Sequence, residues 1–211
     1  MLDLQHKQKL IEAITFFVKN TRNCGLTKLF KLLYWLDYHH FRETGEMVTG
    51  LTYNAYERGP VPDTLFRELK SGDGDIASKF RVVGNSTIDS APLRTIDDDD
   101  LTFGSKAGHG VINKPTAIVP IDPYKHRFLS RREQRIADRI AEIFKDVNAK
   151  DISEISHGRF GPWQQALKTG GERSVIDFFG KLVPMTKGDY LDELTLRLHA
   201  KDLEEDIKAL G

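Results

Sequence analysis

The sequence predicts one α+β domain that is mainly helical, with a small antiparallel sheet and a C-terminal helical extension. Apolar residues recur at helical spacing towards both ends of the chain. Between them, the segment from Ser71 to Asp122 is rich in glycine, proline and aspartate and holds short β-branched runs, which favours strands and loops. We expect residues 1–170 to form the domain, with a variable strand and loop insert at 71–125, and residues 171–211 to form the extension.

Two helices are predicted in the N-terminal part of the chain. Their apolar stripes have the spacing of a helix face packed on a core: Leu10, Ile11, Ile14, Phe17 and Val18 in the first, and Leu26, Leu29, Phe30, Leu33 and Leu36 in the second. Thr27 can cap the start of the second helix. Gly45 follows its end, where a left-handed residue costs glycine least. We therefore expect a core helix between Leu26 and Gly45.

The residues after this helix predict a strand and a rigid corner. Alternating apolar residues from Met47 to Tyr56 indicate a half-buried strand, which Gly59 and Pro60 are expected to end. Pro62 suits the first turn of the next helix, because its missing N–H would have no intrahelical partner there. The corner has two interpretations of similar weight: a purely structural turn, or a rigid turn that presents an aromatic and arginine anchor to a partner.

A capping box opens a further helix in the second half. The Ser130 hydroxyl can accept from the N3 amide while Glu133 reaches back to the cap amide. From Asp189 onward another stripe predicts a terminal helix, formed by Leu191, Leu194, Leu198, Leu203, Ile207 and Leu210. Its acidic run Glu204–Asp206 is most simply a solvated face. Core element, dimer contact and partner-binding arm all fit this terminal helix.

The composition narrows the classes of function. The chain has 31 lysine and arginine residues and 31 aspartate and glutamate residues, so it has no net basic charge that would indicate nucleic-acid binding. Cys24 is the single cysteine, which excludes an internal disulfide and cysteine-based zinc clusters. The N-terminus lacks an apolar signal core, and no run of about 18 uncharged apolar residues occurs. We expect a soluble, cytoplasmic protein without a membrane partner.

No motif in the sequence points to chemistry. The aspartate run 97–100 is contiguous and lacks the alternating ligands of a calcium loop. The glycine cluster 104–110 is not followed by the lysine and hydroxyl residue of a phosphate-binding loop. The histidines form no metal-binding pair on one helix, and no nucleophile elbow is present. We therefore expect no cofactor, no metal and no enzymatic activity.

Three blocks of residues carry a resemblance to a known family. The blocks are Lys28, Leu29, Lys31, Leu32, Leu33 and Tyr34; then Gly45, Thr49, Gly50, Tyr53 and Ala55; then Gly59, Pro60, Val61 and Pro62. The run Ser153–His157 and the pair Pro162 and Trp163 supply a later signature. In this order the chain resembles the Panacea domain family, the SocA-like antitoxins, over roughly residues 5 to 168. The resemblance implies an antitoxin that neutralises a cognate protein toxin, by direct binding or by delivery to a protease.

Candidate partner-binding residues follow from the corner and from the later signature. They are Tyr53, Tyr56, Arg58, Gly59, Pro60, Val61, His157 and Trp163. His157 also suits a structural role at a helix C-terminus. Direct toxin binding is the leading hypothesis, and an adaptor that hands a client to an AAA+ protease is the first alternative.

A transcriptional regulator that binds nucleic acid is the second alternative. It rests on the basic residues Lys125, His126, Arg127, Arg131, Arg132 and Arg135, which could track phosphates although the whole chain is neutral. A solvated helix start explains the same cluster. The sequence leaves the oligomeric state open, a homo-oligomer included.

Overall fold

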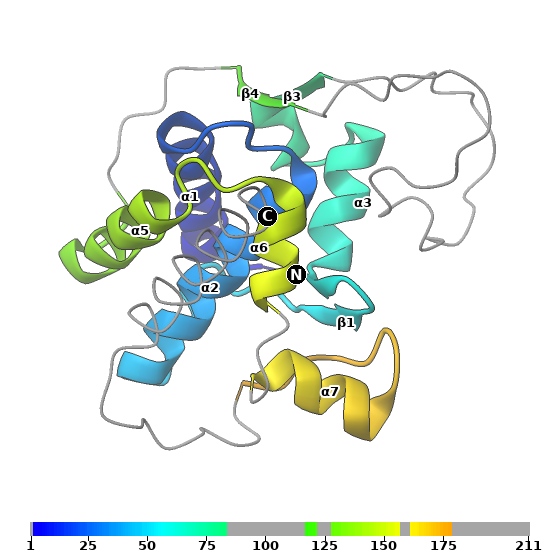
Figure 1. Cartoon of the computed structure of the whole chain (residues 1–211). Helices are drawn as coiled ribbons and strands as arrows, with labels where there is room; N and C mark the ends of the chain where they lie inside the picture. The colour runs from blue at the N-terminus through cyan, green and yellow to red at the C-terminus, as the bar shows by residue number, and fades with distance from the viewer. Residues whose placement is uncertain (1, 84–116, 122–127, 157–160, 179–211) are drawn as a thin grey trace, which may run out of the picture.

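Helices dominate the structure, and the strands form two antiparallel pairs. The computed structural model describes residues 2–83, 117–121, 128–156 and 161–178. In chain order the elements are α1 (Leu4–Asn20), α2 (Leu26–Thr44), β1 (Asn54–Tyr56), β2 (Gly59–Val61), α3 (Asp63–Ser71), the 3-10 helix η1 (Ala77–Lys79), β3 (Phe80–Val83), β4 (Ala117–Pro120), α5 (Arg131–Ile143), α6 (Ala149–Ser156) and α7 (Pro162–Gly170) (Figure 1). The predicted mainly helical α+β fold is confirmed.

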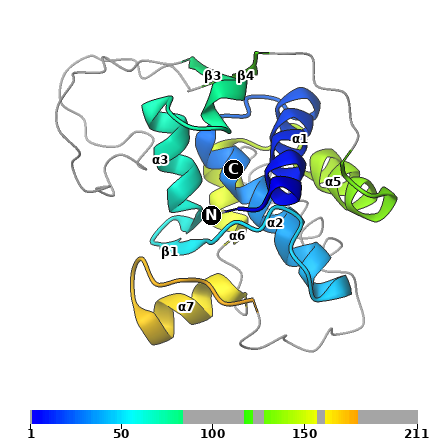
Figure 2. The same ribbon diagram turned by 180° about the vertical axis from the view of Figure 1, so that it is seen from behind.

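Helix α2 lies at the centre of the core. Helices α1, α5 and α6 and strand β2 pack around it (Figures 1 and 2). Every residue from Lys28 to Phe41 is buried, so the helix is enclosed on all sides and not only along its apolar stripe. Five of these buried residues are lysine, aspartate or histidine: Lys28, Lys31, Asp37, His39 and His40. A core helix with such residues must supply each of them with polar partners.

The two ends of α2 test the predicted caps. Gly45 has φ 80°, in the left-handed region, and its N–H donates to Phe41 O, as predicted. The prediction that Thr27 caps the helix was wrong. The helix already begins at Leu26, so Gly25 is the N-cap residue and no side chain caps this end.

The predicted strand and corner form a hairpin. Of the predicted strand from Met47 to Tyr56, only Asn54–Tyr56 is β-strand, because the preceding segment turns through Gly50 at φ 66°. Gly59 and Pro60 do not end the strand: they belong to β2, which pairs antiparallel with β1 through Asn54↔Val61, Ala55↔Pro60 and Tyr56↔Gly59. Gly59 has φ 106°, which suits the turn that glycine permits. Pro62 precedes α3 as its N-cap residue rather than lying in the first turn.

The predicted insert contains a second antiparallel pair. Strands β3 and β4 pair through Phe80↔Pro120, Arg81↔Val119, Val82↔Ile118 and Val83↔Ala117. This small sheet contacts α3 through β3 and α1 through β4. It confirms that the segment predicted to hold strands and loops contains a small antiparallel sheet. Residues 84–116 and 122–125 of the insert, and the predicted terminal helix from Asp189, lie outside the described residues.

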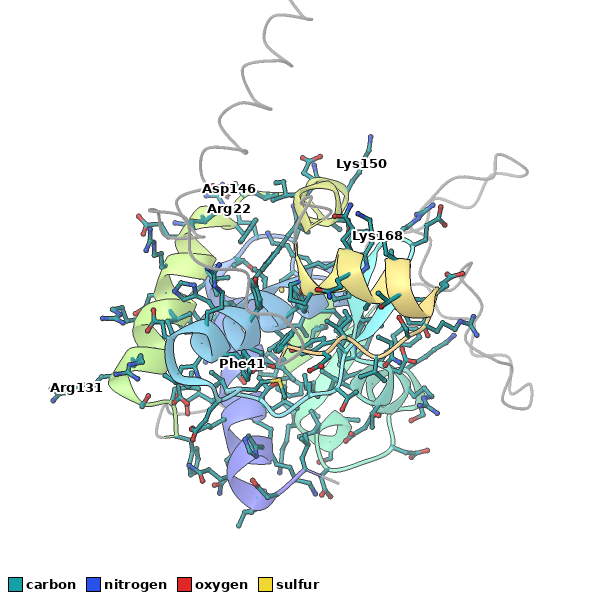
Figure 3. All side chains as sticks on the ribbon, turned by 90° about the horizontal axis from the view of Figure 1, so that it is seen from below. Arg22, Phe41, Arg131, Asp146, Lys150 and Lys168 are labelled. Carbon is teal, nitrogen blue, oxygen red and sulfur yellow. The ribbon has the colours of Figure 1, made fainter. Side chains whose placement is uncertain are left out.

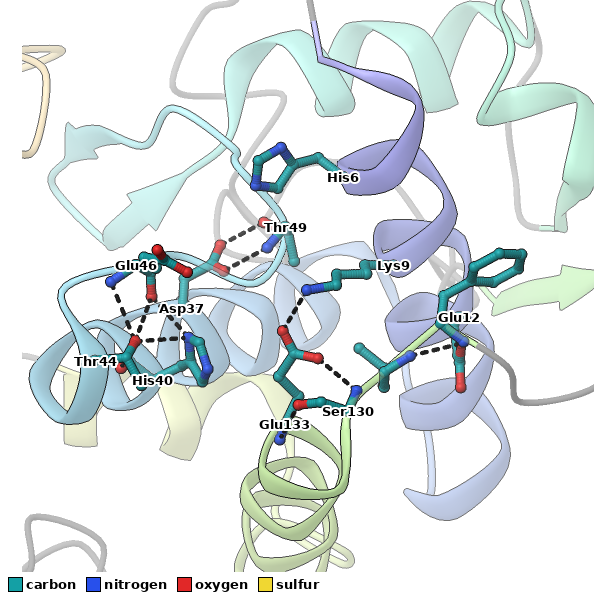
Figure 4. A network of polar contacts seen from close by, with 12 residues as sticks. His6, Lys9, Glu12, Asp37, His40, Thr44, Glu46, Thr49, Ser130 and Glu133 are labelled. Atoms are coloured by element: carbon teal, nitrogen blue, oxygen red, sulfur yellow. Dashed lines mark hydrogen bonds and ion pairs between the residues drawn. The ribbon is translucent and has the colours of Figure 1, made fainter.

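The capping box is confirmed and also ties α5 to α1. Ser130 Oγ accepts from Glu133 N at 3.3 Å, and Glu133 Oε2 accepts from Ser130 N at 2.6 Å. The other Glu133 oxygen accepts from Lys9 Nζ of α1 at 2.6 Å (Figure 4). The buried Glu12 carboxylate, also on α1, accepts from Phe128 N at 2.7 Å. Two carboxylates thus fix the start of α5 against α1. None of the described helices combines the length and the apolar character that a membrane span requires.

Candidate partner-binding surface

Lys31 joins the core helix to the β1–β2 hairpin. Its side chain is 2% exposed, and Nζ donates to Pro60 O at 3.0 Å. The Ala55 N–H is used on the far side of the hairpin, so Ala55 and Pro60 form a pair without mutual hydrogen bonds. The missing N–H of Pro60 therefore costs the sheet nothing, and its carbonyl is left for the lysine. Burial lowers the pKa of Lys31 to about 7.

Lys28 joins two loops at the other end of the core. Nζ donates to Arg22 O at 2.8 Å and to Lys145 O at 3.2 Å, so one lysine binds the α1–α2 loop and the segment after α5. The Arg22 N–H also donates to Lys145 O at 2.8 Å. The side chains of Arg22 and Asp146 form an exposed ion pair nearby, at 2.9 Å (Figure 3). Burial lowers the pKa of Lys28.

Asp37 holds the turn between α2 and the hairpin. Its carboxylate accepts from Thr49 N at 2.7 Å and from the Thr49 hydroxyl (Figure 4). It also accepts from Tyr53 OH at 2.7 Å. All three residues are buried. Burial raises the pKa of Asp37, and the hydrogen bonds from Thr49 and Tyr53 oppose that rise. Burial, and next the neighbouring Asp37, raise the pKa of Tyr53 well above its usual range.

The outer edge of β1 is covered by residues 173–178, which we name the strap. Ala55 N donates to Ser174 O at 2.8 Å, Arg173 N donates to Ala55 O at 2.7 Å, and Ile176 N donates to Tyr53 O at 2.8 Å. Asn54 and Val175 form an antiparallel bridge. Phe178 then enters an aromatic cluster, with ring centroids within 6.0 Å of those of Tyr34, Tyr38, Phe41 and Tyr53. The strap therefore belongs to the packed fold, although it follows the predicted boundary at residue 170.

The structure brings most of the predicted partner-binding residues together, and it buries them. Trp163 Nε1 donates to Tyr56 O at 2.9 Å, which joins the later signature to the hairpin. The exposed fraction is 2% for Tyr56 and 6% for Trp163. Tyr53, Gly59, Pro60 and Val61 are also buried. Arg58, at the turn of the hairpin, is the exposed member, and His157 lies outside the described residues.

Two further arginines lie near Asp63, which binds Tyr56 of the hairpin. The Arg173 guanidinium carbon is 5.6 Å from the centroid of the Tyr56 ring, a cation–π distance. Tyr56 OH donates to Asp63 Oδ2 at 3.1 Å at the start of α3. Burial raises the pKa of Asp63, and the Tyr56 hydrogen bond and the positive charges of Arg67 and Arg173 oppose that rise.

We name the exposed residues Arg58, Arg67 and Arg173 the arginine rim. Arg67 and Arg173, which come from α3 and from the strap, were not among the residues predicted from the sequence. No local motif marks either residue, because only the fold brings α3 and the strap to Asp63.

The basic residues considered for nucleic acid are partly neutralised. Arg135 Nη2 lies 3.4 Å from Glu43 Oε2, and Arg132 Nε lies 4.0 Å from the same oxygen. Residues 125–127 lie outside the described residues. Among the residues that the structure describes, no three histidine, cysteine, aspartate or glutamate side chains are grouped so as to hold a metal ion.

A comparison with protein-family models identifies the domain. The model described as "Antitoxin SocA-like, Panacea domain" matches residues 29–164. The match begins in α2 and ends next to Trp163, so it contains the hairpin, Lys31 and Asp37. Searches of curated proteins and of solved structures gave no match.

Proposed function

Because the chain belongs to the SocA-like antitoxin family with its Panacea domain, we propose that it is an antitoxin that neutralises a cognate protein toxin by direct binding. The proposal gives the arginine rim the role of the toxin contact. It assigns no catalytic step to this protein, and it places the encounter in the cytoplasm. The toxin surface that fits the rim is acidic.

The single observation that carries the proposal is that the hairpin is held from both edges while its turn stays exposed. Lys31 binds β2, and the strap pairs with β1. Trp163 binds the carbonyl of Tyr56, just before the turn. A turn that is ordered before binding loses little conformational entropy when a partner docks. Arginine is also among the residue types enriched at interface hot spots.

The buried residues among the predicted partner-binding set do not touch the toxin in this proposal; they hold the hairpin in place. Tyr53, Pro60, Val61 and Trp163 hold the hairpin, and the toxin touches the arginines that the hairpin and its neighbours present. Substituting a buried member would then reduce neutralisation through loss of fold. Substituting a rim arginine would reduce neutralisation without such a loss, and that difference can be measured.

Co-expression with the product of the adjacent open reading frame tests the proposal. Growth should stop when that product is expressed alone and recover when this chain is added. The Arg58→Glu and Arg67→Glu double variant should lose at least about tenfold in affinity for the purified toxin, because the reversed charges repel an acidic surface. Its unfolding midpoint should stay that of the wild type.

Arg131→Glu is the matched control. Arg131 is exposed on α5, on the opposite side of α2 from the hairpin (Figures 1 and 3). This variant should neutralise as the wild type does. A harmless neighbouring product would refute the antitoxin role. Equal neutralisation by the double variant would refute the rim as the contact, and a toxin half-life that falls when this chain is present would indicate delivery to a protease instead.

A further inference from the structure

The β3–β4 sheet has one face packed on the protein and one face open. Phe80 and Ile118 are buried against the helices, as alternation along the two strands requires. The opposite face carries Arg81 and Val83 from β3, and Ala117 and Val119 from β4. Ile121 follows two residues after Val119, and its N–H donates to Lys79 O at 2.9 Å, which continues the ladder. We name these five residues the outer face.

The outer face is apolar to a degree that is unusual for a solvated surface. Val83 is 50% exposed, Val119 is 46% exposed and Ile121 is 52% exposed. Three large apolar side chains on one side of a two-stranded sheet form a contiguous patch rather than scattered single residues. Contiguous exposed apolar patches mark interaction sites more often than ordinary surface.

Arg81 determines which partner fits. It lies opposite Val119 in the register, in the middle of the apolar residues. Within the part of the chain that the structure describes, no carboxylate lies within ion-pair distance of Arg81, and the outer face itself contains no acidic residue. A partner that covers this face must therefore supply a carboxylate for the guanidinium, because burying the arginine without one is costly.

Two other arrangements fit less well. A second copy of this chain, packed face to face around a two-fold axis, would bring two Arg81 side chains towards each other without an acidic group between them. Addition of a strand along β4 would meet Pro120, which has no N–H to donate to a neighbouring strand. A helix laid across the face needs no backbone donors and covers a sheet in the usual way.

We propose that the outer face of β3–β4 is a docking site for an amphipathic helix of a protein partner, with an apolar stripe over Val83, Val119 and Ile121 and a carboxylate beside the stripe that pairs with Arg81. The site uses none of the arginine rim residues. This proposal can therefore be tested independently of the proposed toxin contact.

Two synthetic helical peptides of about 20 residues, long enough to hold a helix in water, test the proposal. They share one leucine stripe and differ at a single flanking position, which is glutamate in one and lysine in the other. The glutamate peptide should bind the full-length chain about tenfold more tightly than the lysine peptide in fluorescence anisotropy at low salt. Arg81→Glu should reverse this preference, and Val119→Lys should abolish the binding of the glutamate peptide.

Lys168→Glu is the charge control. Lys168 is exposed on α7, which lies at the other end of the molecule from β3–β4 (Figures 1 and 2), so its variant should keep the wild-type preference. Absence of binding, or a preference unchanged in Arg81→Glu, would overturn the proposal. Tighter binding of a peptide of residues 187–211 would assign the face to the chain's own C-terminal segment instead. A wild-type dimer in sedimentation that Val119→Lys dissociates would assign it to a second copy.

Discussion

The two strand pairs that the structure describes are held in opposite ways. The β1–β2 hairpin is enclosed: Lys31 binds one edge, the strap pairs with the other, and Trp163 binds the carbonyl before the turn. The β3–β4 pair rests one face on α1 and α3 and leaves the other open. The β1–β2 hairpin is therefore a fixed part of the core, whereas β3–β4 has an exposed face. The strands of β1–β2 are held along both edges, by a side chain of α2 and by the backbone of the strap, whereas β3–β4 is packed on the helices through one face only.

We expect the largest effect from a substitution at Trp163, which helps to enclose β1–β2. Trp163→Ala should lower the free energy of unfolding by about 3–5 kcal/mol, because it removes a buried aromatic ring. Trp163→Phe, the matched control, keeps a ring and loses the hydrogen bond to Tyr56 O, so its cost should be smaller, about 1–3 kcal/mol. Urea unfolding followed by far-UV circular dichroism measures both. An alanine variant as stable as the wild type would show that the hairpin is not held in this way.

The second effect concerns the charge state of Lys31. Its pKa is about 7 in the folded protein and about 10.4 in the unfolded chain, so between these values the unfolded chain binds more protons. The free energy of unfolding therefore rises with pH through this window. The stability gained in this way at high pH is lost again as the pH falls towards 7, because Lys31 must then be protonated inside the core. From pH 7 to pH 9 the gain in the wild type should exceed the gain in Lys31→Met by about 2 kcal/mol. Parallel pH profiles for the two proteins would contradict this.

A smaller effect on stability is expected at Tyr53, which binds Asp37 just before the hairpin. Tyr53→Phe removes the hydroxyl that donates to Asp37, while the two Thr49 donors remain. The cost should be about 1–2 kcal/mol. Thr52→Ala, at an exposed neighbouring position, should change stability by less than about 0.5 kcal/mol. Thermal unfolding of both variants, read against the wild type, separates these outcomes.

The smallest effect is expected on the open sheet. Val119→Thr replaces one β-branched residue by another on the exposed face, so the free energy of unfolding should change by less than about 0.5 kcal/mol. The same substitution should weaken the binding of the glutamate helix, because it removes a methyl group from the apolar patch. A loss of stability as large as that of Tyr53→Phe would mean that the outer face is part of the core, and the contrast between the two strand pairs would disappear.

The sequence predicted the helices better than the strands, for a physical reason. The period of α2, the left-handed Gly45 and the capping box at Ser130 are local, and the structure has all three. The strand from Met47 was predicted too long because alternation alone cannot show that the side chain of Asp37 binds the preceding turn. That contact joins residues 12 positions apart.

The candidate surface was predictable only in part. The sequence pointed to the corner and to Trp163, and the structure joins them through the Tyr56 carbonyl. It could not show that the aromatic residues are buried, because an aromatic residue near a turn fits a core and an interface equally well. Nor could it indicate Arg67 and Arg173, which α3 and the strap bring to Asp63. The family motif residues Lys28 and Lys31 similarly look like surface lysines until the carbonyls that they bind are seen.

The strap also determines where a truncated fragment of this chain can end and still fold. The family match ends at residue 164, but a fragment that stopped there would leave the N–H and C=O groups of Ala55 without the partners that Arg173 and Ser174 provide. An unpaired strand edge is a template on which other chains assemble. The loss of Phe178 would also open the aromatic cluster at the end of α2. Fragments that end before Phe178 should therefore aggregate, and those that include it should stay in solution.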